Sequence, residues 1–355
     1  MSERVPSTSS NRMSDRMSDR MPDRIGFVVI GRNEGERLRA CLRSLEQTAG
    51  LIVYVDSGST DDSVDFARSL GVTIVELDRS ISFSAARARN AGFERLRRLR
   101  PDLELVHFVD GDCTLAQDWV RHAVDLLDRE SAVVAVCGRR RERNRQGSAY
   151  NRICDVEWRS PPAGEARAFG GEVLIRAAPL ARVGGYDPSV IAAEDDELAI
   201  RLRAGGGRIW RLERTASHHD AAIERLSQWW QRAVRCGHGY AQVGALHPDP
   251  PEYYFRRERR RAWLWGGLIP LAALALAWPS RGFSLLLIVL YPLRIARVAA
   301  ATARDGFEID AWPWAVSCIA SQPANLLGML KFYARHFSGQ GTRIIEYKGT
   351  PGDGR

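Results

Sequence analysis

Two carboxylates one residue apart follow an apolar run in the segment HFVDGDC, residues 107–113. Asp110 and Asp112 flank Gly111, and a glycine lets the backbone approach a ligand closely. Carboxylate oxygens suit Mg²⁺ or Mn²⁺, which typically bind one or two protein carboxylates and complete their shell with phosphate oxygens and water. The spacing therefore indicates a divalent ion that holds a diphosphate, with an ordinary acidic turn as the alternative.

A second acidic segment, DSGSTDDS, covers residues 56–63 and also follows an apolar run. Part of it reads as a turn and a helix cap, because Ser59 or Thr60 can cap a helix whose first turn holds the two aspartates that follow. That cap leaves Asp56 unexplained. An acid at the very end of a buried strand can accept a hydrogen bond from a nucleobase or a sugar, so we predict that Asp56 contacts a bound ligand.

Two arginines stand at the start of a predicted helix in the segment SFSAARARNAG, residues 82–92. Cations at a helix N-terminus oppose the helix dipole, so Arg87 and Arg89 call for a compensating charge. An anionic ligand would supply it, and solvation on a surface turn is the alternative. Four consecutive acids, residues 194–197, begin another predicted helix, where the helix dipole accounts for two or three of them.

These side chains need a scaffold that brings them together, and the hydrophobic pattern predicts one. Apolar runs rich in β-branched residues alternate with stretches at helical spacing, which predicts an α/β fold with a parallel sheet covered on both faces. Ligands bind outside the carboxyl ends of such strands, so one rim of the sheet should gather the polar groups that follow them. The strands are predicted at residues 25–30, 51–55, 72–77 and 103–109, and the arginine-bearing helix at residues 84–99.

The order and spacing of these motifs resemble the family 2 glycosyltransferases with the GT-A fold. GFVVIGRNEG, VDSGSTDDS, the ARN of residues 88–90 and FVDGDC resemble the nucleotide-sugar half of that family, and residues 169–206 resemble its acceptor region. The resemblance covers roughly Ile25 to Gly244. It implies a GT-A-type, Rossmann-like, mostly parallel sheet with flanking helices, a nucleotide-sugar donor and a Mg²⁺ or Mn²⁺ cofactor.

Carried over position by position, the resemblance implies a role for each motif residue. Asp195 would be the catalytic base and Asp112 the principal metal ligand. His219, at the end of a predicted strand, is a candidate to complete the metal site, and the alternative is a polar loop histidine. The donor would meet Asn33, Glu34, Asp56, Arg89 and Asp110, and the acceptor region would hold Gly170, Gly171, Glu194, Trp229, Trp230 and Arg232.

The segment after this region departs from the processive members of the family. Those carry Q-x-x-R-W, whereas here Arg232 comes four residues after Gln228 and no tryptophan follows it. The departure argues against a polysaccharide synthase. Trp229 and Trp230 can stack on a sugar ring or lie against a membrane, and the sequence leaves both readings open.

Uncharged apolar runs near the C-terminus predict a membrane hairpin with spans at about residues 262–278 and 282–300. Each run is near or below the roughly 20 residues that span a bilayer, so buried core helices are the alternative. Arginine clusters flank the runs on the side that the positive-inside rule assigns to the cytoplasm. A third apolar segment, residues 311–330, contains two prolines and is predicted to be re-entrant or interfacial, with a third span as the alternative.

The chain of 355 residues is therefore divided into five parts. They are a disordered leader at residues 1–24, a glycosyltransferase domain at 25–245, a basic linker at 246–261, a membrane region at 262–335 and a tail at 336–355. The net charge of +8 could indicate nucleic acid, but the arginine clusters adjoin the apolar runs, where anionic lipid headgroups explain them. Six cysteines without a C-x-x-C pair suit a reducing compartment and no structural zinc.

Taken together, the sequence predicts an inverting, metal-dependent glycosyltransferase at the inner (cytoplasmic) membrane, with its catalytic domain in the cytoplasm. The acceptor hydroxyl is expected on a lipid-linked molecule, and no nucleic acid is expected as a partner. One alternative is a nucleotidyltransferase, although GRNEG after the first strand supplies little of the glycine-rich basic loop that such enzymes use. The other is a membrane-anchored protein that binds nucleotide sugars without turnover.

Overall fold

A computed structural model gives the structure of the chain and describes residues 21–46, 48, 50–249 and 252–339. The predicted leader up to residue 20 and the predicted tail from residue 340 lie outside the described residues. The last residues of the predicted disordered leader, Met21–Arg24, form helix α2 instead. The physical reason is Arg24, whose guanidinium pairs with Glu104 at 2.9 Å and with Asp128 at 2.7 Å.

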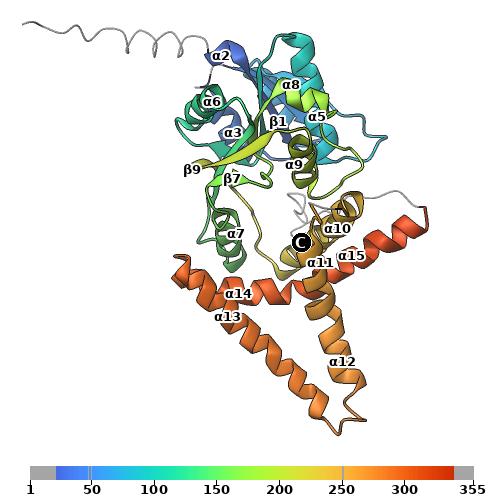
Figure 1. Cartoon of the computed structure of the whole chain (residues 1–355). Helices are drawn as coiled ribbons and strands as arrows, with labels where there is room; N and C mark the ends of the chain where they lie inside the picture. The colour runs from blue at the N-terminus through green and yellow to red at the C-terminus, as the bar shows by residue number, and fades with distance from the viewer. Residues whose placement is uncertain (1–20, 47, 49, 250–251, 340–355) are drawn as a thin grey trace, which may run out of the picture.

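Four parallel strands in the order β3-β2-β1-β4 form the first half of the sheet (Figure 1). Side chains of β1 alternate between its faces: Val28 packs with residues of α5, whereas Phe27 and Val29 pack with residues of α3. Both faces are therefore covered, as predicted. The elements are β1 (Ile25–Gly31), α3 (Glu36–Glu46), β2 (Leu51–Asp56), α4 (Ser63–Ser69), β3 (Thr73–Glu76), α5 (Ala85–Leu99) and β4 (Leu105–Asp110).

The second half makes the sheet mixed rather than mostly parallel. β8 lies antiparallel between β4 and β6, and the strands of the described residues make four parallel and four antiparallel pairings. The prediction missed this because β5, β7 and β8 are only three or four residues long and carry almost no periodic signal. The elements are β5 (Cys113–Leu115), α6 (Trp119–Arg129), β6 (Val133–Glu142), α7 (Ala149–Arg159), β7 (Gly164–Ala166), β8 (Val173–Arg176), α8 (Ala177–Arg182), α9 (Glu194–Ala204) and β9 (Arg208–His219).

Helices follow the sheet and form a V whose open end faces the sheet (Figure 1). α11, η1 and α12 form one arm, and η2 with α13 returns as the other, while α14 and α15 cross between the V and the sheet. Gly237 and Gly328 allow α10 and α15 to touch, because a Cβ at either would overlap the backbone of the other helix. The elements are α10 (Leu226–Leu246), α11 (Arg256–Trp263), η1 (Leu264–Leu268), α12 (Ile269–Ala275), η2 (Phe283–Val289), α13 (Leu290–Arg304), η3 (Glu308–Asp310), α14 (Ala311–Ala320) and α15 (Gln322–Phe337).

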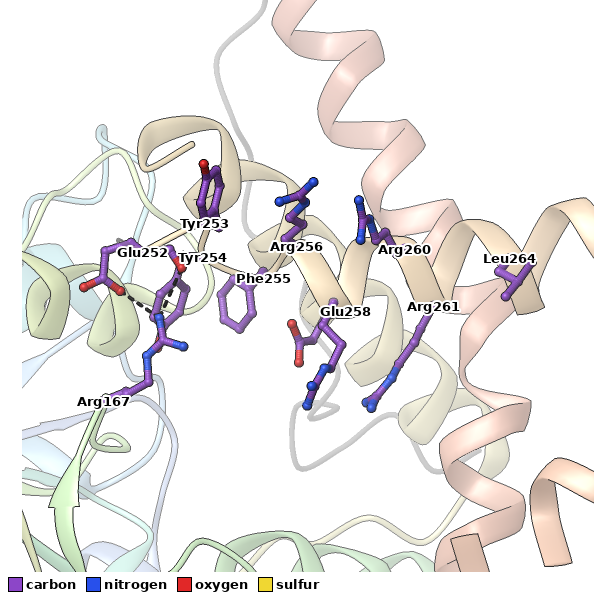
Figure 2. Close-up of a pocket in the computed structure, with 11 residues that line it drawn as sticks. Arg167, Glu252, Tyr253, Tyr254, Phe255, Arg256, Glu258, Arg260, Arg261 and Leu264 are labelled. Carbon is purple, nitrogen blue, oxygen red and sulfur yellow. Dashed lines mark hydrogen bonds and ion pairs between the residues drawn. The ribbon is translucent and has the colours of Figure 1, made fainter. Parts of the chain in front are cut away.

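One helix of the described residues, Phe283–Arg304, is long and apolar enough to cross a membrane. The first predicted span, residues 262–278, follows the arginines of α11 in sequence and does not itself qualify as a membrane-spanning helix among the described residues. A two-span hairpin is therefore not confirmed. The third apolar segment breaks at Ser321 into α14 and α15 rather than forming one long helix. The arginines of the predicted basic linker lie on α11, and four of them, Arg256, Arg257, Arg260 and Arg261, line a pocket of about 620 Å³ (Figure 2).

Candidate functional site

The strand ends converge as the sequence predicted. In the register of the sheet, Gly31 of β1 lies beside Asp56 of β2, and Ile30 lies beside Asp110 of β4. Gly111 donates its backbone N–H to the carbonyl of Ile30 at 2.8 Å, which holds the Asp110 loop against the end of β1. One edge of the sheet therefore carries the acids of two neighbouring strands.

Asn33 and Asp56 tie the loops after β1 and β2 together. Asn33 has a left-handed backbone with φ 54°, and its side-chain oxygen accepts the N–H of Thr60 at 2.7 Å. Asp56 is 2% exposed and accepts hydrogen bonds from Tyr54, from two backbone N–H groups and from the Ser59 hydroxyl. Asp56 therefore shapes this loop, and its contact with a nucleobase stays a prediction.

The predicted helix cap in this loop is wrong. α4 begins at Ser63, and its N-cap residue is Asp62. The Ser59 hydroxyl oxygen instead accepts a hydrogen bond from the backbone N–H of Asn33 at 2.9 Å, which links the loop after β1 to the loop after β2. Glu34, on the same loop as Asn33, pairs with Arg37 at 2.8 Å and lies beside Gly111.

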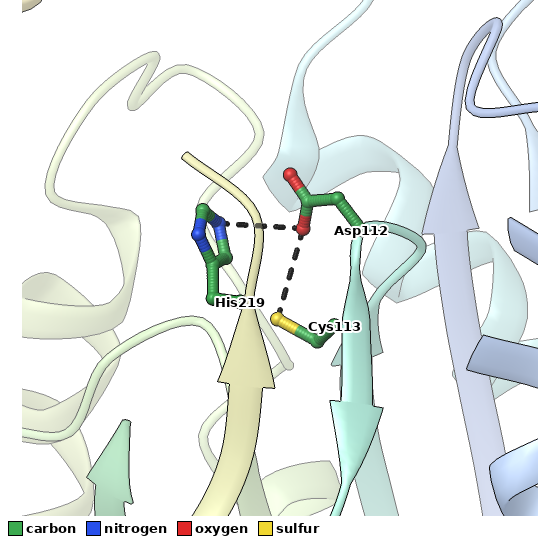
Figure 3. Close-up of side chains that lie close together, drawn as sticks. All are labelled: Asp112, Cys113 and His219. Atoms are coloured by element: carbon green, nitrogen blue, oxygen red, sulfur yellow. Dashed lines mark hydrogen bonds and ion pairs between the residues drawn. The ribbon is translucent and has the colours of Figure 1, made fainter. Parts of the chain in front are cut away.

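Asp112 and His219 form the core of the candidate metal site (Figure 3). β5 pairs with β9 so that Cys113 lies opposite His219, and this register brings His219 Nε2 to 3.3 Å from Asp112 Oδ1. The Cys113 thiol lies 3.7 Å from the same oxygen, and the three potential ligand atoms lie within 4.8 Å of one another. The carboxylate of Asp112 is a ligand that Mg²⁺ and Mn²⁺ prefer, whereas the imidazole of His219 and the thiol of Cys113 are softer ligands, so Asp112 carries the fit to the predicted ion.

Arg89 joins the donor side of the site to α9. Its buried guanidinium donates to Asp110 Oδ1 at 2.9 Å and to Glu194 Oε1 at 2.8 Å, and it lies 3.4 Å from Asp195 Oδ1. The carboxylates of these three residues, rather than the anionic ligand that the sequence predicted, supply the compensating charge for Arg89. Arg87 behaves differently, because it is bonded to backbone carbonyls on the surface and matches the surface-turn alternative.

The two acids at the start of α9 have pKa values shifted in opposite directions. Burial, opposed by the nearby Arg89, raises the pKa of Asp195 to about 7. Burial also disfavours ionisation of Glu194, but Arg89 and Arg235 outweigh it and hold the pKa of Glu194 below its usual value. Tyr186 donates its hydroxyl to Asp195 at 3.3 Å. Asp195 can therefore accept a proton near neutral pH, whereas Glu194 serves as a permanent anion for Arg89.

A cavity of about 530 Å³ opens beside Asp195. Gly170, Gly171 and Arg232, which the sequence placed in the acceptor region, line this cavity together with Asp195. Glu194 does not line it but contacts its wall through Arg89. The structure thus brings the predicted base and three of the six predicted acceptor residues to one space.

Trp229 and Trp230 do not line this cavity. Trp229 is buried, and its indole N–H donates to the Ser317 hydroxyl of α14 at 3.1 Å. Trp230 packs with Val234 and with Ala324 of α15. Both tryptophans therefore pack α10 against the C-terminal helices, and the sugar contact and the membrane contact stay predictions.

Sequence reasoning missed Glu172. This side chain is 5% exposed, lines the same cavity and accepts the hydroxyl hydrogen of Ser217 through Oε2. Burial, opposed by Arg140, raises the pKa of Glu172 to about 7, and among the described residues its Oε1 has no hydrogen-bond partner. The available signal was an acid between two glycines and an apolar run, in FGGEVLI.

The chain resembles known proteins both in sequence and in fold. Residues 27–181 match the family model described as glycosyl transferase family 2. The succinoglycan biosynthesis protein ExoA of Rhizobium meliloti (strain 1021) is 26% identical over 207 residues, which cover 55% of this chain and 61% of that protein. The mannosyltransferase PcManGT from Pyrobaculum calidifontis, solved with GDP-Man and Mn²⁺, superposes with a TM-score of 0.58 at 21% identity, covering 86% of this chain and 87% of that one. The latter likeness shows a shared fold.

Proposed function

The chain belongs to glycosyl transferase family 2, and we propose that it is an inverting, metal-dependent enzyme that moves a sugar from a nucleotide-sugar donor to a hydroxyl group. The observation that carries this proposal is the buried Arg89, which holds Asp110 of the donor rim and Asp195 of α9 within one ion-pair network. One terminal nitrogen of this guanidinium thereby contacts Asp110, and the other contacts the proposed base Asp195. The acceptor enters through the cavity beside Asp195.

The donor binds along the rim formed by the loops after β1, β2 and β4. Hydrogen bonds of Asn33 with Ser59 and Thr60 hold the loop that would face the nucleoside. Asp110 lies beside Ile30 at the end of β1. Asp112 and His219 would hold a Mg²⁺ or Mn²⁺ ion, with Asp110 at the ribose or the ion. When bound, that ion would stabilise the negative charge that develops on the leaving nucleoside diphosphate.

Asp195 acts as the general base that removes the proton of the acceptor hydroxyl. Its carboxylate borders the cavity, and a pKa of about 7 makes it a competent base at neutral pH. One base and one displacement at the anomeric carbon invert its configuration. Arg89 keeps the base oriented and, through Asp110, in register with the donor rim.

The acceptor is proposed to be lipid-linked, at the cytoplasmic face of the inner membrane. Large apolar side chains are exposed along both arms of the V, among them Leu271, Leu274 and Leu286 at 65%, 70% and 64%. Exposed apolar surface of this kind marks contact with a membrane or a partner. Residues 25–245 would then form the catalytic domain, with residues 246–261 as the linker and 262–335 as the membrane region.

Replacement of the base gives the direct test. We expect Asp195→Asn to lower kcat by about 10²- to 10⁴-fold with little change in donor affinity. The matched control is Asp196→Asn, because Asp196 follows in sequence but bonds to Tyr254. In the wild type, kcat/KM should rise as the pH increases through about 7, since Asp195 must lose its proton, and this limb should vanish in Asp195→Asn.

The products separate the proposed function from its alternatives. Release of a nucleoside diphosphate and an inverted glycoside supports sugar transfer. Release of pyrophosphate would identify a nucleotidyltransferase, and absence of turnover with every nucleotide sugar would favour a binding protein. Transfer that persists unchanged in Asp195→Asn would remove Asp195 as the base.

A further inference from the structure

A second cavity, of about 420 Å³, lies between the catalytic domain and the C-terminal helices. Its walls come from α7, α10, α11, α13, α14 and α15. Three arginines from three different helices line it, Arg232 of α10, Arg261 of α11 and Arg294 of α13, against the two glutamates Glu157 and Glu258. Helices far apart in the sequence thus bring an excess of positive charge to one space.

The arginines of this cavity differ in how they are neutralised. Arg232 makes a two-pronged ion pair with Glu157 at 2.8 and 2.9 Å. Arg261 and Arg294 form no ion pair or side-chain hydrogen bond with any residue that the structure describes. A guanidinium is a planar fork that suits phosphate oxygens, so two guanidinium groups without an anionic partner, lining one cavity, suit a phosphate or diphosphate.

The direction of Arg261 distinguishes it from its neighbours on α11 (Figure 2). Arg256 and Arg260 point to one side of the helix, whereas Glu258 and Arg261 point to the other. Arg260 lines the neighbouring pocket but not this cavity, and Arg261 lines both. Among the linker arginines that the structure describes, Arg261 is therefore the one that lines the second cavity.

The second cavity adjoins the catalytic cavity. Glu157, Arg232, Cys236 and Tyr240 line both spaces, so the ion pair of Arg232 with Glu157 stands at their boundary. On the far side, Trp265 and Arg294 lie on the two arms whose exposed apolar side chains form the V. An amphiphile can thus place its tail along the arms, its anionic group in the second cavity and its hydroxyl in the first.

We propose that the cavity between α10, α11, α13 and α14 binds the phosphate or diphosphate of a lipid-linked acceptor through Arg261 and Arg294. This inference rests on the proposed function and adds the site that would hold the acceptor. Basic pockets between membrane-proximal helices can also bind the headgroups of anionic phospholipids. The test therefore needs arms that separate an isoprenoid diphosphate from a bilayer phosphate.

The experiment measures binding of farnesyl diphosphate to the full-length chain in detergent micelles, by titration calorimetry. Arg261→Ala/Arg294→Ala should raise the Kd by at least about tenfold, because two charge-assisted contacts are lost. Arg260→Ala/Arg297→Ala is the matched control, since it removes the same charges from the same two helices at exposed positions outside the cavity. The control should bind as the wild type does.

Two further measurements fix the interpretation. Flotation with vesicles of phosphatidylcholine and phosphatidylglycerol should be equal for both double variants. Mn²⁺-dependent binding of a nucleoside diphosphate, if it is retained, would show that both double variants fold. Unchanged farnesyl diphosphate binding in Arg261→Ala/Arg294→Ala overturns the proposal, and so does a loss confined to vesicle flotation. Because the readout is binding and not turnover, failure here is distinct from failure of the proposed sugar transfer.

Discussion

Glu172 is the residue whose environment is least expected from the sequence. A glutamate in an unfolded chain ionises near pH ~4.3, whereas burial raises the pKa of Glu172 to about 7 in the fold. Between these values the folded protein keeps a proton that the unfolded chain has released. Stability from this group is therefore present below the unfolded pKa and is lost as the pH rises towards 7.

Glu172→Gln should remove this pH dependence, because glutamine imitates the protonated acid. We expect the free energy of unfolding of the variant to match that of the wild type near pH 5. Near pH 8 it should exceed the wild-type value by an amount on the order of 2 kcal/mol. Chemical denaturation in the presence of a chelator measures the free energy of unfolding at both pH values. The control is Glu130→Gln, at an exposed position. An identical loss of stability in wild type and Glu172→Gln between these pH values would show that Glu172 is already ionised in the fold.

At the residue scale, the sequence predicted where acids stand better than it predicted their partners. Asp110 and Asp112 could be singled out because a motif and its place after a strand are local properties, whereas Asp195 was singled out by the family resemblance. The pairing of Arg89 with Glu194 joins residues 105 positions apart and depends on how α5 and α9 meet. Likewise, the full set of hydrogen bonds to Asp56 depends on a loop conformation that no local pattern encodes.

Among the elements, the turn before β8 shows how little space the site allows. A Cβ on Gly171 would come within 2.5 Å of Asp110 Oδ2 and 2.8 Å of a terminal nitrogen of Arg89. A Cβ on Gly170 would meet only the Arg140 guanidinium, at 3.6 Å, which is an ordinary contact. The site therefore requires glycine at position 171 for steric reasons, whereas position 170 has room for a methyl group.

Gly171→Ala should lower kcat/KM by about 10- to 100-fold, because it pushes Asp110 and Arg89 out of line. Gly170→Ala should stay within about twofold of the wild type, since an ordinary contact displaces nothing. Steady-state kinetics with one nucleotide sugar measures both variants. Equal activity in the two variants would mean that the ion pair of Arg89 with Asp110 tolerates displacement and does not align the site.

The elements with a strong period were predicted within a few residues, and the short ones were not. β1, β2 and β4 are largely buried apolar runs, and α5 ends at Leu99 as expected. β8 has four residues, and its antiparallel direction follows from long-range pairing with β4 and β6. The break at Ser321 was hinted at by Pro323, although a proline in an apolar segment does not reveal where the two resulting helices pack.

On the scale of the whole molecule, the catalytic half and the V of helices act as one unit. Gly237 and Gly328 fix α10 against α15, and Arg145 of the loop before α7 pairs with Asp310 at the start of α14. The catalytic cavity therefore stands at a set position above the arms with the exposed leucines. The sequence indicated both halves, but their contact surface depends on packing between segments remote along the chain.

Donor binding at the rim of the sheet underlies every other role assigned to the molecule. A ligand that binds only the folded chain raises its melting temperature by mass action. The decisive measurement is thermal unfolding of the wild type, Asp112→Asn and the exposed control Asp102→Asn, with UDP, GDP and dTDP and with or without Mn²⁺. We predict that at least one nucleoside diphosphate with Mn²⁺ raises the Tm of the wild type and of Asp102→Asn, and that Asp112→Asn loses this combined rise. A full Mn²⁺-dependent rise in Asp112→Asn would contradict a donor site centred on Asp112.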